Sequence, residues 1–149
     1  MKPRIFRLKN DRHEVAGLSK WVDQISAEIG LIATVRGELQ VALEEVALNV
    51  ITHGYGEGGV VKEFSVSLEA DSDFITAVVE DEAPAFDPTG REEADISLPP
   101  DQRLIGGLGI HLVKNLVESM HHERRGARNV LTLRFSRHDS RGASAAEAT

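Results

Sequence analysis

Apolar side chains recur at helical spacing in two segments of the N-terminal third. The first segment follows Asn10 and Asp11, which are N-cap candidates, and ends at Gly30. The second begins near Thr34, another N-cap candidate, and ends at Gly54. The buried stripe of the first is expected at Val15, Leu18, Trp21, Val22, Ile25 and Ile29, and that of the second at Val35, Leu39, Leu43, Val46, Ala47 and Val50. Two amphipathic helices are therefore predicted.

Segments with alternating or β-branched residues predict five strands, at residues 3–8, 60–69, 73–80, 121–126 and 129–136. A turn at residues 70–72 makes the strands at residues 60–69 and 73–80 a hairpin. A third helical stripe follows a Gly-rich turn, at Ile110, Val113, Leu116, Val117 and Met120. The order β-α-α-β-β-loop-α-β-β predicts an α+β fold, a two-layer α/β sandwich with a mostly antiparallel sheet and three helices on one face.

Composition narrows the class of protein. The chain has 149 residues, of which 41% are apolar, enough for one packed domain. A formal net charge of −7 argues against general nucleic-acid binding, which needs clustered Lys and Arg. The chain has no cysteine, so disulfides and thiol chemistry are excluded. No apolar stretch resembles a signal peptide or reaches membrane-spanning length, so we expect no membrane association and a cytoplasmic protein.

Two segments lack periodicity. Residues 82–106 contain Pro84, Pro88, Pro99 and Pro100, and a loop this long is usually a functional lid or disordered. The residues after Arg137 are small and polar. We therefore expect one domain at residues 1–137 and a disordered tail at residues 138–149.

Two polar positions stand out beside the apolar pattern. Glu45 and Asn49 are four residues apart, so they share a helical face next to the buried stripe, where a polar helix edge is the ordinary explanation. Asp81 ends the strand FITAVVED. A carboxylate at a strand end can accept a hydrogen bond from an exocyclic amine such as that of adenine, but it can equally initiate a turn.

The turn Gly106-Gly107-Leu108-Gly109 leads directly into the third helix. Glycines allow backbone N–H groups to approach phosphate oxygens, and a helix N-terminus favours an anion. The turn matches neither the Rossmann fingerprint nor a P-loop. By itself it also fits an ordinary tight loop before a helix.

The three motifs together are more specific than any one of them. Glu-x-x-x-Asn on a helix, Asp-x-Ala-x-x-Phe after a strand and Gly-x-Gly opening a helix, in that order, resemble the N, G1 and G2 boxes of the GHKL (Bergerat-fold) ATP-binding superfamily. The resemblance covers residues 3–137. The strings DEAPAFDP and IGGLGIHLVKNLV are most similar to the branch of bacterial anti-sigma-factor serine-protein kinases.

The resemblance implies a role for each motif residue. Asn49 would bind Mg²⁺ on the triphosphate, Glu45 would be the general base, and Asp81 would bind the adenine amino group, supported by Thr132. In many members Gly stands where this chain has Ala83, a change that is tolerable if the backbone φ there is negative. The remaining residues expected to bind the nucleotide are His53, Ala83, Phe86, Arg103, Gly106, Gly107, Leu108, Gly109 and Ile110.

The resemblance also implies an activity and partners. We expect an ATP-dependent serine/threonine-protein kinase and anti-sigma factor that phosphorylates a STAS-domain antagonist, binds a sigma factor and pairs as a homodimer. One alternative is a non-catalytic module of the same fold that binds ATP and a partner. Another is a detached histidine-kinase catalytic domain, which we expect less because no helical hairpin with an acceptor His precedes the motifs and His13 lacks flanking helical length.

Overall fold

The computed structural model describes residues 1–56, 60–85 and 107–138. Its sheet is built from five strands, and three helices cover it. The strands are β1 (Arg4–Lys9), β2 (Glu63–Ala70), β3 (Phe74–Asp81), β4 (Ser119–Arg125) and β5 (Arg128–Ser136). The helices are α1 (Val15–Glu28), α2 (Ala33–Asn49) and α3 (Gly107–Leu116), with a short 3-10 helix, η1 (Arg12–Glu14), before α1 and a π-helical segment, η2 (Val50–Tyr55), after α2.

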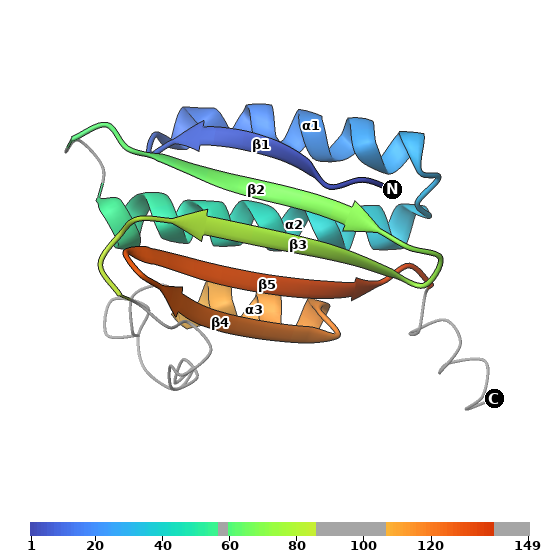
Figure 1. Cartoon of the computed structure of the whole chain (residues 1–149). Helices are drawn as coiled ribbons and strands as arrows, with labels where there is room; N and C mark the ends of the chain where they lie inside the picture. The colour runs from blue at the N-terminus through green and yellow to red at the C-terminus, as the bar shows by residue number, and fades with distance from the viewer. Residues whose placement is uncertain (57–59, 86–106, 139–149) are drawn as a thin grey trace.

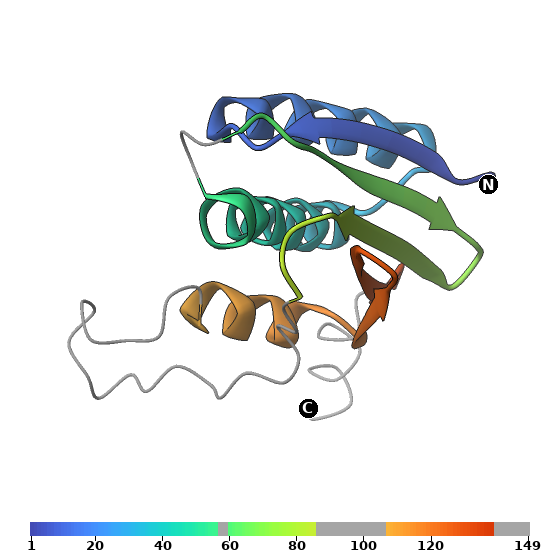
Figure 2. The ribbon, with the colours of Figure 1, turned by 60° about the vertical axis from the view of Figure 1, so that its left-hand side comes forward.

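All neighbouring strands are antiparallel, in the order β1-β2-β3-β5-β4. Both views place α1, α2 and α3 on one face of the sheet, with α2 between the other two (Figure 1, Figure 2). This arrangement confirms the predicted element order and the two-layer α+β sandwich. The carboxyl end of β3 and the start of β5 lie side by side, since Asp81 pairs with Asn129.

The core lies between the sheet and the helices and is almost wholly aliphatic. Alternation along β3 and β5 directs every second side chain toward the helices. These meet the buried stripe of α2, where Leu39, Leu43, Val46 and Ala47 are each at most 2% exposed. Phe6 and Trp21 pack together at the end of the core near β1, with ring centroids 5.4 Å apart.

The helix boundaries differ in detail from those expected. Asp11 is the N-cap, but of η1, where its carboxylate accepts a hydrogen bond from the backbone N–H of His13. Thr34 is not an N-cap, because α2 begins one residue before it and Ile32 occupies the cap position. Gly54 does not end the helix either. The chain continues past Asn49 as the π-helical segment η2, and Gly56, with φ of 80°, ends it.

The hairpin turn between β2 and β3 is held by a side chain. Oδ1 of Asp71 accepts hydrogen bonds from the backbone N–H groups of Asp73 and Phe74, at 2.8 Å each. Such a turn pre-orders the chain reversal that brings β2 and β3 together.

Two expectations fall where the chain is not described. Most of the expected lid, with Phe86, Arg103 and Gly106, lies outside the described residues, and so does the expected tail from residue 139 onward. In the described ranges, every helix is too short or too polar to cross a bilayer.

Candidate functional site

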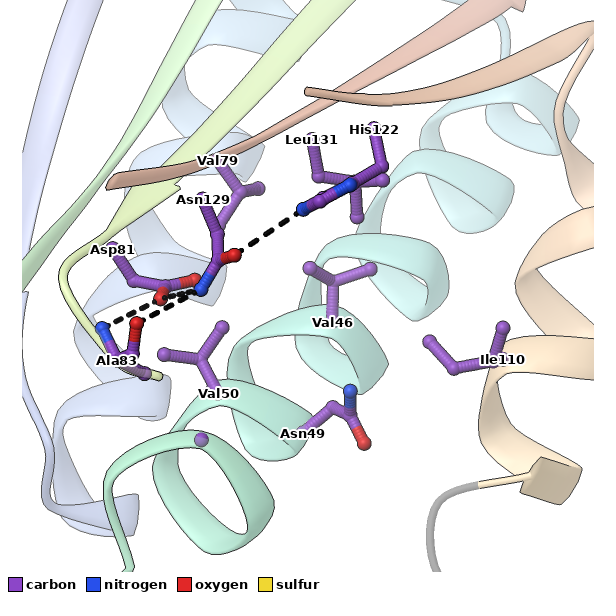
Figure 3. Close-up of a pocket in the computed structure, with 11 residues that line it drawn as sticks. Val46, Asn49, Val50, Val79, Asp81, Ala83, Ile110, His122, Asn129 and Leu131 are labelled. Carbon is purple, nitrogen blue, oxygen red and sulfur yellow. Dashed lines mark hydrogen bonds between the residues drawn. The ribbon is translucent and has the colours of Figure 1, made fainter. Parts of the chain in front are cut away.

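One pocket opens between α2, the first turn of α3 and the adjoining ends of β3 and β5 (Figure 3). We refer to it as the main pocket. It brings together Asn49, Asp81, Ala83 and Ile110, four of the residues expected from sequence. Its other lining residues are Val46, Val50, Gly54, Val79, His122, Asn129 and Leu131. A mostly apolar wall with a few polar groups at its rim is typical of a small-molecule site.

Asp81 lies at the strand end of the main pocket, with only 9% of its surface exposed. Its Oδ1 atom accepts two hydrogen bonds, from the backbone N–H of Ala83 at 3.0 Å and from Nδ2 of Asn129 at 2.9 Å. The first bond closes a tight turn directly after β3. The second crosses from β3 to β5, so the carboxylate is anchored by local and by tertiary contacts.

Asn129 links this carboxylate to the far wall of the pocket. Its Nδ2 atom also lies 3.2 Å from the carbonyl oxygen of Ala83 and 3.1 Å from that of Pro84. Its Oδ1 atom lies 3.3 Å from Nε2 of His122 on β4. Figure 3 shows the resulting line of polar contacts from Ala83 through Asp81 and Asn129 to His122.

The segment after Asp81 is fixed from two further sides. Nη1 of Arg124 donates to the carbonyl oxygen of Ala83 at 2.9 Å. The hydroxyl of Tyr55 accepts from the backbone N–H of Glu82 at 2.6 Å and donates to the carbonyl oxygen of Glu63. Burial of the Tyr55 ring raises the pKa of its hydroxyl above 10.0, so it stays protonated and able to donate.

Ala83 takes the place where many members of the superfamily have Gly. Within the described ranges, no residue other than glycine has a positive φ, so the condition stated for this methyl group is met. The side chain is 2% exposed and faces the backbone of η2. A β-carbon added to Gly54 would lie 3.3 Å from Cβ of Ala83, so the close approach needs a glycine at residue 54 instead.

A second, adjoining pocket lies along the same face of α2 towards α3. It is lined by Glu45, Leu48, Asn49, Thr52, His53, Gly109 and Ile110. Asn49 and Ile110 also line the main pocket, so the two pockets adjoin at these residues. The expected base, the expected metal ligand and Gly109 of the first turn of α3 are thereby grouped in the second pocket.

α3 begins at Gly107, so Gly107, Leu108, Gly109 and Ile110 form its first turn. The first N–H groups of any helix have no partner within the helix and favour an anion. Ile110 is buried between the pocket and the core, at 3% exposed. Gly109 faces the carboxylate of Glu45, because a β-carbon there would lie 2.7 Å from Oε2 of Glu45.

The polar groups of the site restrict the kind of metal ion that could bind there. In the described part of the chain, no three His, Cys, Asp or Glu side chains gather into a metal-binding cluster. Oδ1 of Asn49, however, is buried in the site and has no hydrogen-bond partner among the described residues. A single amide oxygen of this kind suits Mg²⁺, which takes most of its ligands from phosphates and water.

The structure corrects the expectation for Thr132. Thr132 pairs with Val78, three residues along β5 from Asn129, and an odd offset in a strand turns the side chain to the other face of the sheet. Asn129 therefore stands beside Asp81, and Thr132 does not. Asn129, His122 and Arg124 were missed from sequence, because the only signal for them is the strand register.

These features define a class. An antiparallel sheet covered on one face by three helices, with a central-helix amide and a strand-end carboxylate facing one pocket, is the arrangement of the GHKL type of ATP-binding protein. A family model described as a histidine kinase-like ATPase domain matches residues 8–135, and the chain belongs to this family. Membership implies that ATP is the nucleotide used.

Two individual similarities refine this result. The chain is 28% identical over 88 residues to the serine-protein kinase RsbW of Bacillus licheniformis. The aligned region covers 56% of this chain and 55% of that protein. The match thus spans about half the length of the curated relative. A crystal structure of the RsbU and RsbW domains of a Mycobacterium tuberculosis protein superposes with a TM-score of 0.64 at 16% identity, covering 91% of this chain and 32% of that one. The second likeness shows the fold.

Proposed function

We propose that the chain is an ATP-dependent protein-serine/threonine kinase that also acts as an anti-sigma factor. The similarity to a serine-protein kinase supports the reaction. The proposed phosphate acceptor is a serine of a STAS-domain antagonist, the second partner is a sigma factor, and the active unit is a homodimer. The proposed cellular location of the protein is the cytoplasm, where both partners would be found.

One observation carries the proposal. Asn49 and Asp81, 32 positions apart in sequence, line the same pocket, and Asn49 also lines the adjoining pocket that contains Glu45 and Gly109. An extended nucleotide could place its base at Asp81 and its phosphates at the first turn of α3. The two ends of ATP would then meet the two kinds of group that suit them: a hydrogen-bond acceptor and a set of backbone N–H groups.

Phosphoryl transfer asks mainly for positioning and charge neutralisation. Glu45, half-buried at the α3 end of the site, would accept the proton of the incoming serine hydroxyl. The N–H groups of Gly107, Gly109 and Ile110 would bind phosphate oxygens, with Gly106, Leu108 and Arg103 expected beside them. His53 would line this end, and Phe86 and Ala83 the base end.

Asn49 is the proposed protein ligand of Mg²⁺, through the buried Oδ1 atom that has no partner in the described part of the chain. Bound there, the ion would supply positive charge to the triphosphate as the γ-phosphoryl group leaves. Phosphorylation of the antagonist would add about two negative charges at its interface with this acidic chain and would favour its release.

The test is incubation of the chain with γ-labelled ATP, magnesium and each STAS-domain protein encoded nearby. We expect label on serine or threonine of one of them. Glu45→Gln should retain ATP binding and lose transfer by about a hundredfold or more, as for a general base. Glu69→Gln, which removes the same charge from an exposed site on β2, is the matched control.

Other outcomes would change the assignment. ATP binding without transfer by the wild-type chain would make it a non-catalytic binding module. Label on histidine would make it the catalytic part of a histidine kinase. Transfer that survives Glu45→Gln unchanged would remove Glu45 from the role of base.

A further inference from the structure

The two oxygens of Asp81 have different surroundings. Oδ1 accepts both hydrogen bonds, from Ala83 and Asn129. Among the described residues, no hydrogen bond reaches Oδ2, although Asp81 lines the main pocket. One oxygen thus holds the carboxylate in place and leaves the other to accept from a ligand.

The orientation of the Asn129 amide follows from its neighbours. Three acceptors surround Nδ2: Oδ1 of Asp81 and the carbonyl oxygens of Ala83 and Pro84. The flipped amide would bring its own oxygen against all three, which is repulsive. Its Oδ1 atom instead accepts from Nε2–H of His122, which fixes the other end of the amide.

We propose that Asn129, oriented by His122, is a positioning residue that sets the purine selectivity of the site. The proposal rests on the proposed function, in which Asp81 receives the base. Asn129 is 5% exposed and touches Asp81 rather than the expected position of the reacting phosphate, so it acts through the carboxylate. His122 acts one step further away.

The selectivity follows from donor and acceptor chemistry. A carboxylate oxygen held rigidly toward the base accepts the 6-amino group of adenine. The 6-keto oxygen of hypoxanthine or guanine would face the same atom as a second acceptor, leaving both unpaired in a buried site. Because Asn129 and Ala83 prevent rotation of the Asp81 carboxylate, it cannot turn away to relieve this repulsion.

The experiment is calorimetric titration of the full chain with ATP and with inosine triphosphate, which differs by the keto group, in the presence of magnesium. We expect the wild-type chain to prefer ATP by at least about a hundredfold, because a missing hydrogen bond to a buried acceptor is heavily discriminated. Asn129→Leu should weaken the binding of ATP far more than the binding of inosine triphosphate. It should therefore lower the preference for ATP by at least about tenfold.

The His122 variants test the second step with less risk to folding. His122→Leu should lower the ATP preference about threefold to tenfold, since it removes the hydrogen bond that orients Asn129. His122→Gln, whose amide N–H can still donate to Asn129, should restore it. Thr76→Val, on the opposite face of β3, is the control, and circular dichroism confirms that each variant is folded.

If these residues had a purely structural role, their substitution would weaken the binding of both nucleotides equally. An unchanged ratio of the two affinities in folded Asn129→Leu and His122→Leu therefore overturns the inference. Failure of His122→Gln to restore the ratio overturns the part assigned to His122. No ATP binding by the wild-type chain would instead contradict the proposed function, so the two failures are distinguishable.

Discussion

A β-carbon placed on Gly109 would lie 2.7 Å from Oε2 of Glu45, closer than β-carbons approach other heavy atoms in proteins. The carboxylate on α2 therefore rests against the first turn of α3, at a position where any β-carbon would force it to move. A negative group is favoured near a helix N-terminus, which holds this contact in place. The proposed base and the proposed phosphate seat are thus coupled through a single glycine.

Gly109→Ala should displace the Glu45 carboxylate. Because misplacing a catalytic group by about 1 Å can reduce the rate about a hundredfold, we expect the rate of phosphoryl transfer to fall about tenfold to a hundredfold, with a smaller change in ATP affinity. Single-turnover kinetics and calorimetry separate the two. Gly37→Ala is the control, since nothing lies within 4 Å of its added carbon. Equal losses in both quantities would contradict this reading.

Asp81→Asn should weaken ATP binding by at least about a hundredfold. The adenine amine would lose the acceptor that the site supplies, and such a loss is strongly unfavourable in a buried site. Oδ1 of the new amide would keep its bonds to Ala83 and Asn129, so its NH₂ group would replace Oδ2 and meet the adenine amine as a second donor. Calorimetry measures the affinity and circular dichroism the fold. Unchanged affinity would place the base elsewhere.

Asn49→Ala should abolish the magnesium dependence of ATP binding, because the buried amide oxygen proposed as the protein ligand is gone. The measurement is ATP affinity with magnesium and with a chelator. Asn115→Ala, whose side chain is exposed on α3 and bonds the carbonyl oxygen of His111, serves as the control. A normal magnesium effect in Asn49→Ala would remove this residue from the metal site.

Gly54 and Ala83 should behave as a coupled pair. Gly54→Ala adds a methyl 3.3 Å from Cβ of Ala83, which we expect to cost about 1–3 kcal/mol of unfolding free energy, as overpacking does. Adding Ala83→Gly should recover part of that loss. Denaturant unfolding of the two single variants and the double variant gives the coupling energy, and additive effects would show that the two residues do not interact.

Asp71→Ala should lower the melting temperature at neutral pH and have less effect in acid. The backbone N–H groups of Asp73 and Phe74 lower the pKa of Asp71 below its usual 3.8. A carboxyl whose pKa is lower in the folded state adds stability above its unfolded pKa, and this is lost as pH falls through the folded value. Melting curves of both proteins should converge below about pH 3. A constant difference would mean that the charge is not involved.

Much of the fold was accessible from local patterns. Helical spacing put Glu45 and Asn49 on one face of α2, and strand alternation put Asp81 at the end of β3, because both depend only on neighbours within a few positions. The Gly-rich turn marked the start of α3 for the same reason. These elements, in their order, were enough to predict the sandwich and the superfamily.

The partner of Asp81 was not accessible in this way. Asn129 and Thr132 lie three residues apart on one strand, and which of them stands beside Asp81 depends on the register of β3 against β5. That register is decided by the packing of both strands onto α2. It brings together Asp81 and Asn129, which are 48 positions apart in the sequence. The amino-acid sequence alone therefore determined which polar groups α2, the end of β3 and the start of α3 carry. The tertiary structure alone decided how they hold one another, because a shift of one residue in strand pairing reverses the face of every side chain.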